Sequence, residues 1–291
     1  MRLHKKQDPY IFLALPIIAY LAVVIVPIAS SIYYSFMDWN GIGAMQFTGI
    51  DNYLKMFRDS NLLTCVINTL KYSLVGTVCQ VGGGLFLAIL VQRVRKGGNL
   101  VRVLLFSPVV ISGMAMAQTF KKLLAINPDG VVNAILNVSG ASKIAFLADT
   151  NITLYIVAIC EAFRFCGLYM VVFYAAFTSI DKEVTEAAAI DGAGFWRQLL
   201  HIRLPLIKGI IMNSIVLAVV GTLKAFEGPF VLTNGGPGYT SELLATYMYK
   251  TAFNKMDYGY GSALSILLVM MCIVVYLMIN LISGKKKEGA K

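Results

Sequence analysis

Apolar residues in this chain occur in long, nearly unbroken runs separated by short segments rich in charged residues and glycine. A helix that spans a lipid bilayer needs about 20 consecutive apolar residues. Six runs reach this length, and they cover residues 10–36, 65–91, 103–126, 152–178, 207–233 and 262–283. The pattern predicts an all-α integral membrane protein, with residues 1–291 forming a single transmembrane domain of six helices.

The first run resembles a secretory signal peptide because basic residues precede it. The hydrophobic part of a signal peptide is only about 7–15 residues long. Here the apolar stretch extends from Tyr10 to Phe36, and no small-x-small cleavage site follows it. We therefore expect an uncleaved first helix. Pro16 and Pro27 predict bends in it, because neighbouring helices can satisfy the carbonyl groups that proline leaves free.

Lysine and arginine are unevenly divided between the two sides of the predicted bundle. One set of connections carries Arg2, Lys5, Lys6, Arg93, Arg95, Lys96, Arg102, Lys182, Arg197, Arg203, Lys208, Lys285, Lys286, Lys287 and Lys291. The opposite set carries only Lys55, Arg58, Lys143, Lys250 and Lys255. Cytoplasmic loops of membrane proteins are enriched in basic residues. The first set is therefore predicted to be cytoplasmic, with both termini inside the cell.

Composition narrows the possible functions. Hydrophobic residues make up 58% of the chain and charged residues 14%, which is too apolar for a soluble fold of this length. The net charge of +10 follows from the loop residues above, so we expect no nucleic-acid partner. The sequence contains no GxxxxGK[ST], HExxH or GxSxG motif and no CxxC pair. We expect no catalytic site, no metal site and no cofactor bound by this chain.

The connection over residues 179–205 has the pattern of a folded element. Asp181 is suited to cap a helix, and Ala187–Ala189 are strong helix formers. Gly192 permits a sharp turn before a second short amphipathic run, Phe195–Ile202. We expect a cytoplasmic helix–turn–helix whose small alanines let another protein approach closely. The alternative is a loop that packs only on its own bundle.

The same connection carries a spaced motif: E-A-A, three residues, G, nine residues, then I-x-L-P. Its members are Glu186, Ala187, Ala188, Gly192, Ile202, Leu204 and Pro205. Two other motifs stand in the outer connections, Phe47-Thr-Gly-Ile-Asp-Asn-Tyr53 and Leu232-Thr-Asn-Gly-Gly-Pro237. In this order, the motifs resemble those of ABC importer permeases of the binding-protein-dependent carbohydrate family, and most closely the F-type subunit of maltose and glycerol-phosphate systems.

Three positions depart from the family pattern. Leu199 stands where a phenylalanine usually precedes I-x-L-P, and Gly209 stands where a second proline often follows. Phe163 replaces a tryptophan that is common ahead of Gly167. These differences bear on the identity of the solute.

The resemblance implies a type I importer fold in which residues 179–205 form the cytoplasmic coupling helix. The residues that it assigns to ATPase coupling are Glu186, Ala187, Ala188, Gly192, Ala193, Ile202, Leu204 and Pro205. It also implies three protein partners in a bacterial cell membrane. They are a second, homologous permease in a heterodimer, a cytoplasmic ATPase dimer that uses ATP and Mg²⁺, and an extracytoplasmic solute-binding protein.

Four charged residues fall inside the predicted membrane spans. Glu161 and Arg164 lie in the fourth span, and Lys224 and Glu227 lie in the fifth, each pair at i, i+3 spacing on one helix face. At 1.5 Å per residue, Glu161 and Lys224 would both lie roughly 13 Å deep. Charges at this depth are costly and mark solute pathways. These four residues and the nearby Thr222 are therefore candidates to line the solute pathway. The alternative is that the charges form two ion pairs that only hold the helices together.

Other functional classes remain open at this stage. A secondary transporter would need coupling-ion sites and commonly shows internal repeats, and no clear repeat is present. A membrane-embedded enzyme would need a nucleophile–base pair or an acidic cluster on one helix face. Within the importer family, the sequence leaves oligosaccharide, monosaccharide, uronate and glycerol phosphate as possible solutes.

Overall fold

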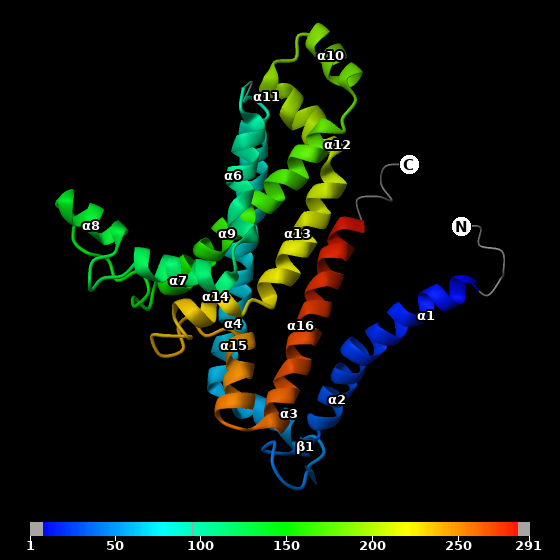
Figure 1. Ribbon diagram of the computed structural model, residues 1–291, viewed down its shortest axis with the longest axis vertical. Coiled ribbons are helices and arrows are strands. Elements are labelled where there is room, and N and C mark those ends of the chain that lie inside the picture. Colours follow the sequence, from blue (N-terminus) through cyan, green and yellow to red (C-terminus); the bar gives the residue numbers. More distant parts are fainter. Residues whose placement is uncertain (1–7, 95, 285–291) are drawn as a thin grey trace. The chain divides into compact units, whose positions relative to one another are not determined.

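The computed structural model describes residues 8–94 and 96–284, and it is almost entirely helical (Figure 1). The chain divides into two compact units. Unit 1 contains the described residues up to Ser60 together with Tyr247–Met270, and unit 2 contains Asn61–Thr246 and the described residues from Met271. Part of the predicted cytoplasmic charge lies outside the described residues: Arg2, Lys5, Lys6, Arg95, Lys285, Lys286, Lys287 and Lys291.

Four helices of the described chain are long and apolar enough to cross a membrane singly. They are Leu13–Tyr34, Ser60–Val91, Thr153–Thr178 and Tyr258–Leu281. Two further spans are bent pairs, Gly98–Val110 with Gly113–Leu123 at 98° and Phe195–Leu206 with Lys208–Leu223 at 68°. The described chain thus has up to six spans when each bent pair counts as one.

Unit 1 begins with one long helical rod. It consists of α1 (Asp8–Tyr20), a π-helical turn (Leu21–Ile25) and α2 (Val26–Tyr34). Pro16 and Pro27 do not break the rod, and Pro27 stands two residues after the π-helical turn. A short hairpin follows, with β1 (Met37–Asp38) antiparallel to β2 (Gln46–Phe47) and Met37 opposite Phe47.

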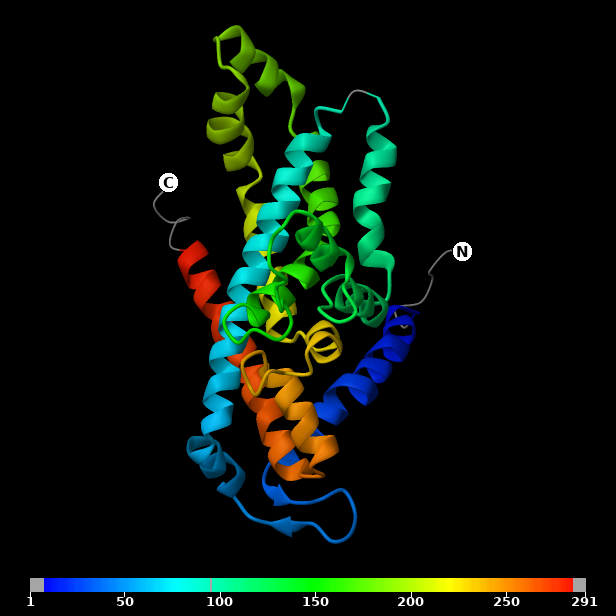
Figure 2. The ribbon, with the colours of Figure 1, turned by 90° about the vertical axis from the view of Figure 1, so that its left-hand side faces the viewer.

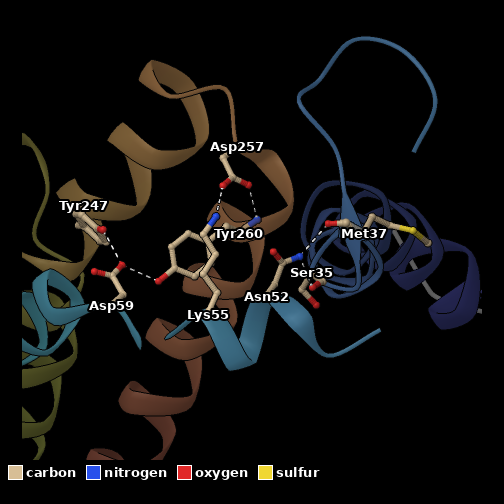
Figure 3. Close-up of polar contacts among 8 residues, drawn as sticks. All are labelled: Ser35, Met37, Asn52, Lys55, Asp59, Tyr247, Asp257 and Tyr260. Carbon is tan, nitrogen blue, oxygen red and sulfur yellow. Dashed lines mark hydrogen bonds and ion pairs between the residues drawn. The ribbon is translucent and has the colours of Figure 1, made fainter. Parts of the chain in front are cut away.

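Polar contacts tie this hairpin and α3 (Asp51–Arg58) to the start of α16 (Tyr258–Gly284) within unit 1 (Figure 3). The Asn52 side chain donates to the carbonyl oxygens of Ser35 and Met37 at 3.0 and 2.9 Å. Lys55 forms an ion pair with Asp257 at 2.6 Å. Segments about 200 residues apart in sequence are therefore joined by side-chain contacts.

The core of unit 2 is built on one straight span and its neighbour. α4 (Ser60–Thr77), a π-helical turn (Val78–Gly82) and α5 (Gly83–Val91) form the span, which packs against α9 (Thr153–Thr178). A Cβ added at Gly84 would lie 2.5 Å from Tyr169 Cβ, so only glycine allows this approach. Val81, Ala88, Val91, Met170, Phe173 and Phe177 fill the interface and are buried.

The third predicted helix, 103–126, differs from the structure, which has two helices there. α6 (Gly98–Val110) ends at Ile111, and α7 (Gly113–Leu123) leaves at 98°. Ile111 has an extended backbone (φ −72°, ψ 139°), and Pro108 in the last turn of α6 supplies no N–H to continue the helix. α7 then packs along α14 (Glu227–Leu232), and α8 (Val131–Val138) follows.

The fifth predicted helix, 207–233, also differs. Its first half begins earlier, as α11 (Phe195–Gln198), a π-helical turn (Leu199–Arg203) and α12 (Leu204–Leu206). After the 68° bend, α13 (Lys208–Leu223) ends at Lys224 rather than near Thr233. Ahead of α11 lies α10 (Lys182–Ile190), and beyond α14 lie α15 (Leu244–Tyr249) and a π-helical turn (Lys250–Asn254).

Candidate functional site

The predicted helix–turn–helix of residues 179–205 is present as α10 and α11. The Asp181 carboxylate accepts a hydrogen bond of 3.1 Å from Glu183 N, which caps α10 as its sequence indicated. α10 ends where Gly192 N donates to Ala189 O at 3.1 Å. Gly192 has a φ of +77°, a left-handed conformation that a residue with a Cβ adopts only at a cost. The turn therefore depends on glycine at this position.

Internal hydrogen bonds hold the helix–turn–helix of α10 and α11, here called the α10–α11 hairpin. Ala193 N donates to Ala188 O at 2.9 Å, and the Gln198 side chain donates to Ala193 O at 2.8 Å. Ala188 is buried, whereas Glu186 and Ala187 are exposed. The hairpin thus has one packed side and one side open to contact.

Large apolar side chains lie on the open side. Ile190 is 87% exposed and Trp196 is 66% exposed. In both views, the hairpin projects beyond the ends of α6 and α9 within unit 2 (Figures 1 and 2). An exposed surface of small, apolar and acidic groups at a projecting turn is suited to bind another protein.

The hairpin is firmly attached to the unit 2 core. Leu199 is buried in the core, and the half-buried Ile202 and Leu204 follow it, with Pro205 exposed. The Arg93 guanidinium lies 3.9 Å from the centre of the Phe195 ring. Arg203 donates to the Gln92 side chain and stacks over Phe177 at 4.8 Å. The hairpin is therefore packed against the end of α5 and against α9.

A second group of candidate residues lies within the spans. Glu161 and Arg164 on α9 form an ion pair, with 3.2 Å between Oε1 and Nη1. A Cβ added at Gly113 would lie 2.6 Å from Arg164 Nη1 and would overlap Glu227 Oε2. A Cβ at Gly228 would lie 3.2 Å from Glu161 Cδ. Glu161, Arg164 and Glu227 therefore converge, and two glycines at the bends make room for them.

Lys224 does not join this cluster as the i, i+3 spacing suggested. Lys224 follows the last residue of α13, and Glu227 is the first residue of α14, so the break over residues 224–226 interrupts the helix on which both side chains were expected. Lys224 is exposed and forms no ion pair within the described chain. The expected Lys224–Glu227 pair is wrong, because the helix on which it depended ends first.

Thr222 has a packing role in this structure. It is buried between α13 and α4, where its Oγ1 lies 2.7 Å from Ser73 Oγ. It also donates to the Ala218 carbonyl at 2.9 Å. A Cβ on Gly76 would come within 3.1 Å of Thr222 Cγ2. A hydroxyl that is satisfied on both sides holds the two helices together.

The cluster contains polar atoms that the protein itself leaves unsatisfied. Arg164 Nε and the Tyr72 hydroxyl are buried and have no hydrogen-bond partner within residues 8–94 and 96–284. Such atoms are costly to bury without a partner. Both can hydrogen-bond to water or to a hydroxylated molecule. Sequence reasoning missed Tyr72 and Gly113, because neither stands in the two predicted spans that carry the charges.

The motif Leu232–Pro237 lies in a segment that α4 holds in place. The Asn68 side chain donates to the carbonyls of Tyr239 and Glu242 at 2.9 and 3.2 Å. Thr69 Oγ1 accepts a hydrogen bond of 2.9 Å from Leu244 N. Polar residues inside the span thus fix the shape of this connection.

Comparison with known proteins identifies the family. Residues 80–288 match the family described as "Binding-protein-dependent transport system inner membrane component". The chain belongs to this family. It is therefore a multi-pass membrane permease of a binding-protein-dependent ABC transporter, and the family inferred from the EAA motif is confirmed.

Relatives of the chain match it along nearly its whole length. A probable ABC transporter permease, YurN of Bacillus subtilis, is 33% identical over 94% of both chains. A probable permease for starch degradation products, AmyD of Thermoanaerobacterium thermosulfurigenes, is 28% identical over 91% of this chain and 90% of its own. The arabinooligosaccharide permease AraP of Bacillus subtilis is 28% identical over 98% and 91%.

Two solved structures have the same fold. A chain of a bacterial ABC transporter that imports the acidic polysaccharide alginate has a TM-score of 0.84 at 24% identity, covering 95% of this chain and 94% of its own. A chain of the bacterial alginate transporter in complex with a pentasaccharide-bound periplasmic protein has a TM-score of 0.85 at 23% identity, covering 98% of both. The predicted type I importer fold is confirmed.

Proposed function

We propose that this permease forms half of the pathway for a sugar or oligosaccharide. The observation that carries the proposal is the convergence of the half-buried Glu161 and Arg164 with the exposed Glu227, beside which the buried Arg164 Nε and Tyr72 hydroxyl have no hydrogen-bond partner among the described residues. A solute rich in hydroxyl groups both donates and accepts hydrogen bonds, so it can satisfy these groups as it passes. Relatives named for starch products and arabinooligosaccharides support this class of solute.

Uptake measurements test the solute class. Membrane vesicles containing the complete transporter would be supplied with its purified binding protein and a panel of labelled oligosaccharides, monosaccharides, uronates and glycerol phosphate. We expect uptake of a carbohydrate, reduced by Glu161→Gln and by Glu227→Gln with the affinity of the binding protein unchanged. Uptake of glycerol phosphate alone would reject the sugar assignment. Normal uptake by both variants would leave the charges with a structural role only.

The proposed assembly contains three kinds of partner. A distinct second permease completes the pathway, a dimeric cytoplasmic ATPase binds the ATP and Mg²⁺, and an extracytoplasmic protein delivers the solute. The described basic residues Arg93, Lys96, Arg102, Lys182 and Arg197 support a cytoplasmic position for the α10–α11 side. Purification of an active complex with two copies of this chain and no second permease would contradict the heterodimer.

The α10–α11 hairpin is the proposed contact with the ATPase. Its exposed Glu186 and its small residues favour close docking, and its attachment through Leu199 carries movement into the spans. Glu186→Arg and Gly192→Asp should leave membrane insertion intact while ATP hydrolysis no longer drives uptake. Normal transport by assembled complexes carrying both changes would rule out this role.

A further inference from the structure

A groove between α6 and α9 has properties that the proposed transport function does not use. Its apolar part is a cavity of about 520 Å³ lined by Asn99, Arg102, Val103, Phe106 and Val171. A polar cavity of about 380 Å³ adjoins it and is lined by Val91, Gln92, Val94, Gly97, Gly98, Asn99, Arg102 and Tyr174. The two cavities share Asn99 and Arg102, so the groove is amphipathic.

The polar and apolar parts are ordered along the helix axes. Arg102 lies in the first turns of α6, and Val103 and Phe106 lie further into the span. On the neighbouring helix, Tyr174 lies near the end of α9, and Val171 lies about one turn deeper. The groove therefore changes from charged to apolar with increasing depth, as the surrounding lipid does.

Among the described residues, none supplies a counter-charge to Arg102. Its Nε donates to Gly98 O at 3.3 Å, it also donates to the Asn99 side chain, and its guanidinium lies 4.3 Å from the centre of the Tyr174 ring. It forms no ion pair with any described residue, and no acidic residue is among those lining either cavity. The positive charge at the polar end is thus available to an anion.

Further donors and cations surround the same place. α6 begins at Gly98 and has no side-chain cap, which leaves its first backbone N–H groups free for an acceptor. Arg203 is bonded to Gln92, which lines the polar cavity, and Lys96 is exposed two residues before Gly98. The local field attracts negative charge.

We infer that this groove binds an anionic phospholipid. The phosphate lies against Arg102 and Asn99, and one acyl chain follows Val103, Phe106 and Val171 into the membrane. A basic pocket between spans, at the depth of the headgroups, is suited to such a ligand. The apolar lower part argues for a lipid over an acidic segment of a neighbouring protein, which would fill only the polar end.

Native mass spectrometry tests the site on the full-length chain with its co-purifying subunits. After removal of endogenous lipid, the complex is titrated with dioleoylphosphatidylglycerol or dioleoylphosphatidylcholine. We expect tighter binding of the phosphatidylglycerol, with a loss of affinity of roughly tenfold or more in Arg102→Gln because a charge-assisted hydrogen bond is removed. Val103→Trp should weaken binding by filling the apolar cavity. Arg58→Gln, at an exposed arginine in unit 1, is the matched control and should bind normally.

Three results would overturn the inference. Equal binding of both lipids, unchanged in Arg102→Gln, would show that Arg102 selects no headgroup. Competition by inorganic phosphate at the affinity of the lipid, with no effect of Val103→Trp, would indicate a free-anion site. Loss of a subunit from Arg102→Gln with undiminished phosphatidylglycerol binding would show that Arg102 contacts a protein.

Discussion

The hydroxyl of Tyr260 donates a hydrogen bond of 2.8 Å to the carboxylate of Asp59, which lies 201 residues earlier in the chain. Tyr247 donates to the same oxygen at 2.7 Å (Figure 3). Both tyrosines are buried, and the ion pair of Lys55 with Asp257 lies beside them. The segment after the first span and the start of the last helix are therefore held together by one carboxylate within unit 1.

Removal of one donor should weaken unit 1. Tyr260→Phe keeps the ring but loses a hydrogen bond to a charged acceptor, so we expect a loss of about 1–2 kcal/mol in the free energy of unfolding. The measurement is thermal unfolding of the purified protein in detergent. Tyr155→Phe is the control, because that hydroxyl makes no hydrogen bond within the described chain and its side chain is partly exposed. Equal effects of the two substitutions would contradict the role of Asp59.

Alanine at either of the two glycines beside the intramembrane charges should displace the charged side chains. A Cβ at Gly113 or at Gly228 would enter the space of Glu227, Arg164 or Glu161. Because the atoms in the way are the ends of flexible glutamate and arginine side chains, which can move, we expect each alanine variant to lose about 1 kcal/mol, at the lower end of the range for overpacking. Gly221→Ala serves as the control, because nothing lies within 4 Å of a Cβ there. Unfolding midpoints that are the same for all three variants would show that the cluster adapts freely.

The turn of the hairpin gives a test based on backbone conformation alone. Gly192 and Gly194 both have open space around a Cβ, but only Gly192 has a positive φ. Gly192→Ala should therefore cost about 1–2 kcal/mol locally, whereas Gly194→Ala should cost little. Hydrogen exchange of the α10 amides would report the difference as faster exchange in Gly192→Ala only. Similar exchange in the two variants would mean that the turn has another stable conformation.

Membrane orientation is tested by labelling from outside the cell. In a variant without the five native cysteines, a cysteine at Asn137 should react with an impermeant maleimide in intact cells. A cysteine at Glu186 should react only after the cells are permeabilised. Tags at either terminus are expected on the cytoplasmic side. Labelling of position 186 in intact cells would reverse the orientation that the basic residues predict.

The sequence predicts the elements that depend on local pattern. The span Thr153–Thr178 follows from its apolar length, and the Asp181 cap and the Gly192 turn follow from residue type. The bend at Ile111 and the end of α13 at Lys224 do not follow, because each lies within a run that is apolar enough to continue as a helix. Packing of α7 along α14 selects the bent form, and this contact joins residues about one hundred positions apart.

The same limit applies to the candidate pathway. The sequence placed Glu161 with Arg164 correctly because both belong to one unbroken helix. It placed Lys224 with Glu227 wrongly because the i, i+3 argument presupposes a helix across both residues. The contact of Ser73 with Thr222 depends on which faces of α4 and α13 meet, and the local sequence pattern does not predict which faces these are.

The space that Gly113 leaves for Glu227 and Arg164 has a consequence for the divergence of these permeases. Substitution at position 113 is not independent of substitution at position 227, because a methyl group at 113 takes the space that the end of the Glu227 side chain occupies. A lineage that acquires alanine at 113 should therefore carry aspartate or a neutral residue at 227, and the two changes should be found together. The two positions should therefore covary across related sequences although they lie 114 positions apart.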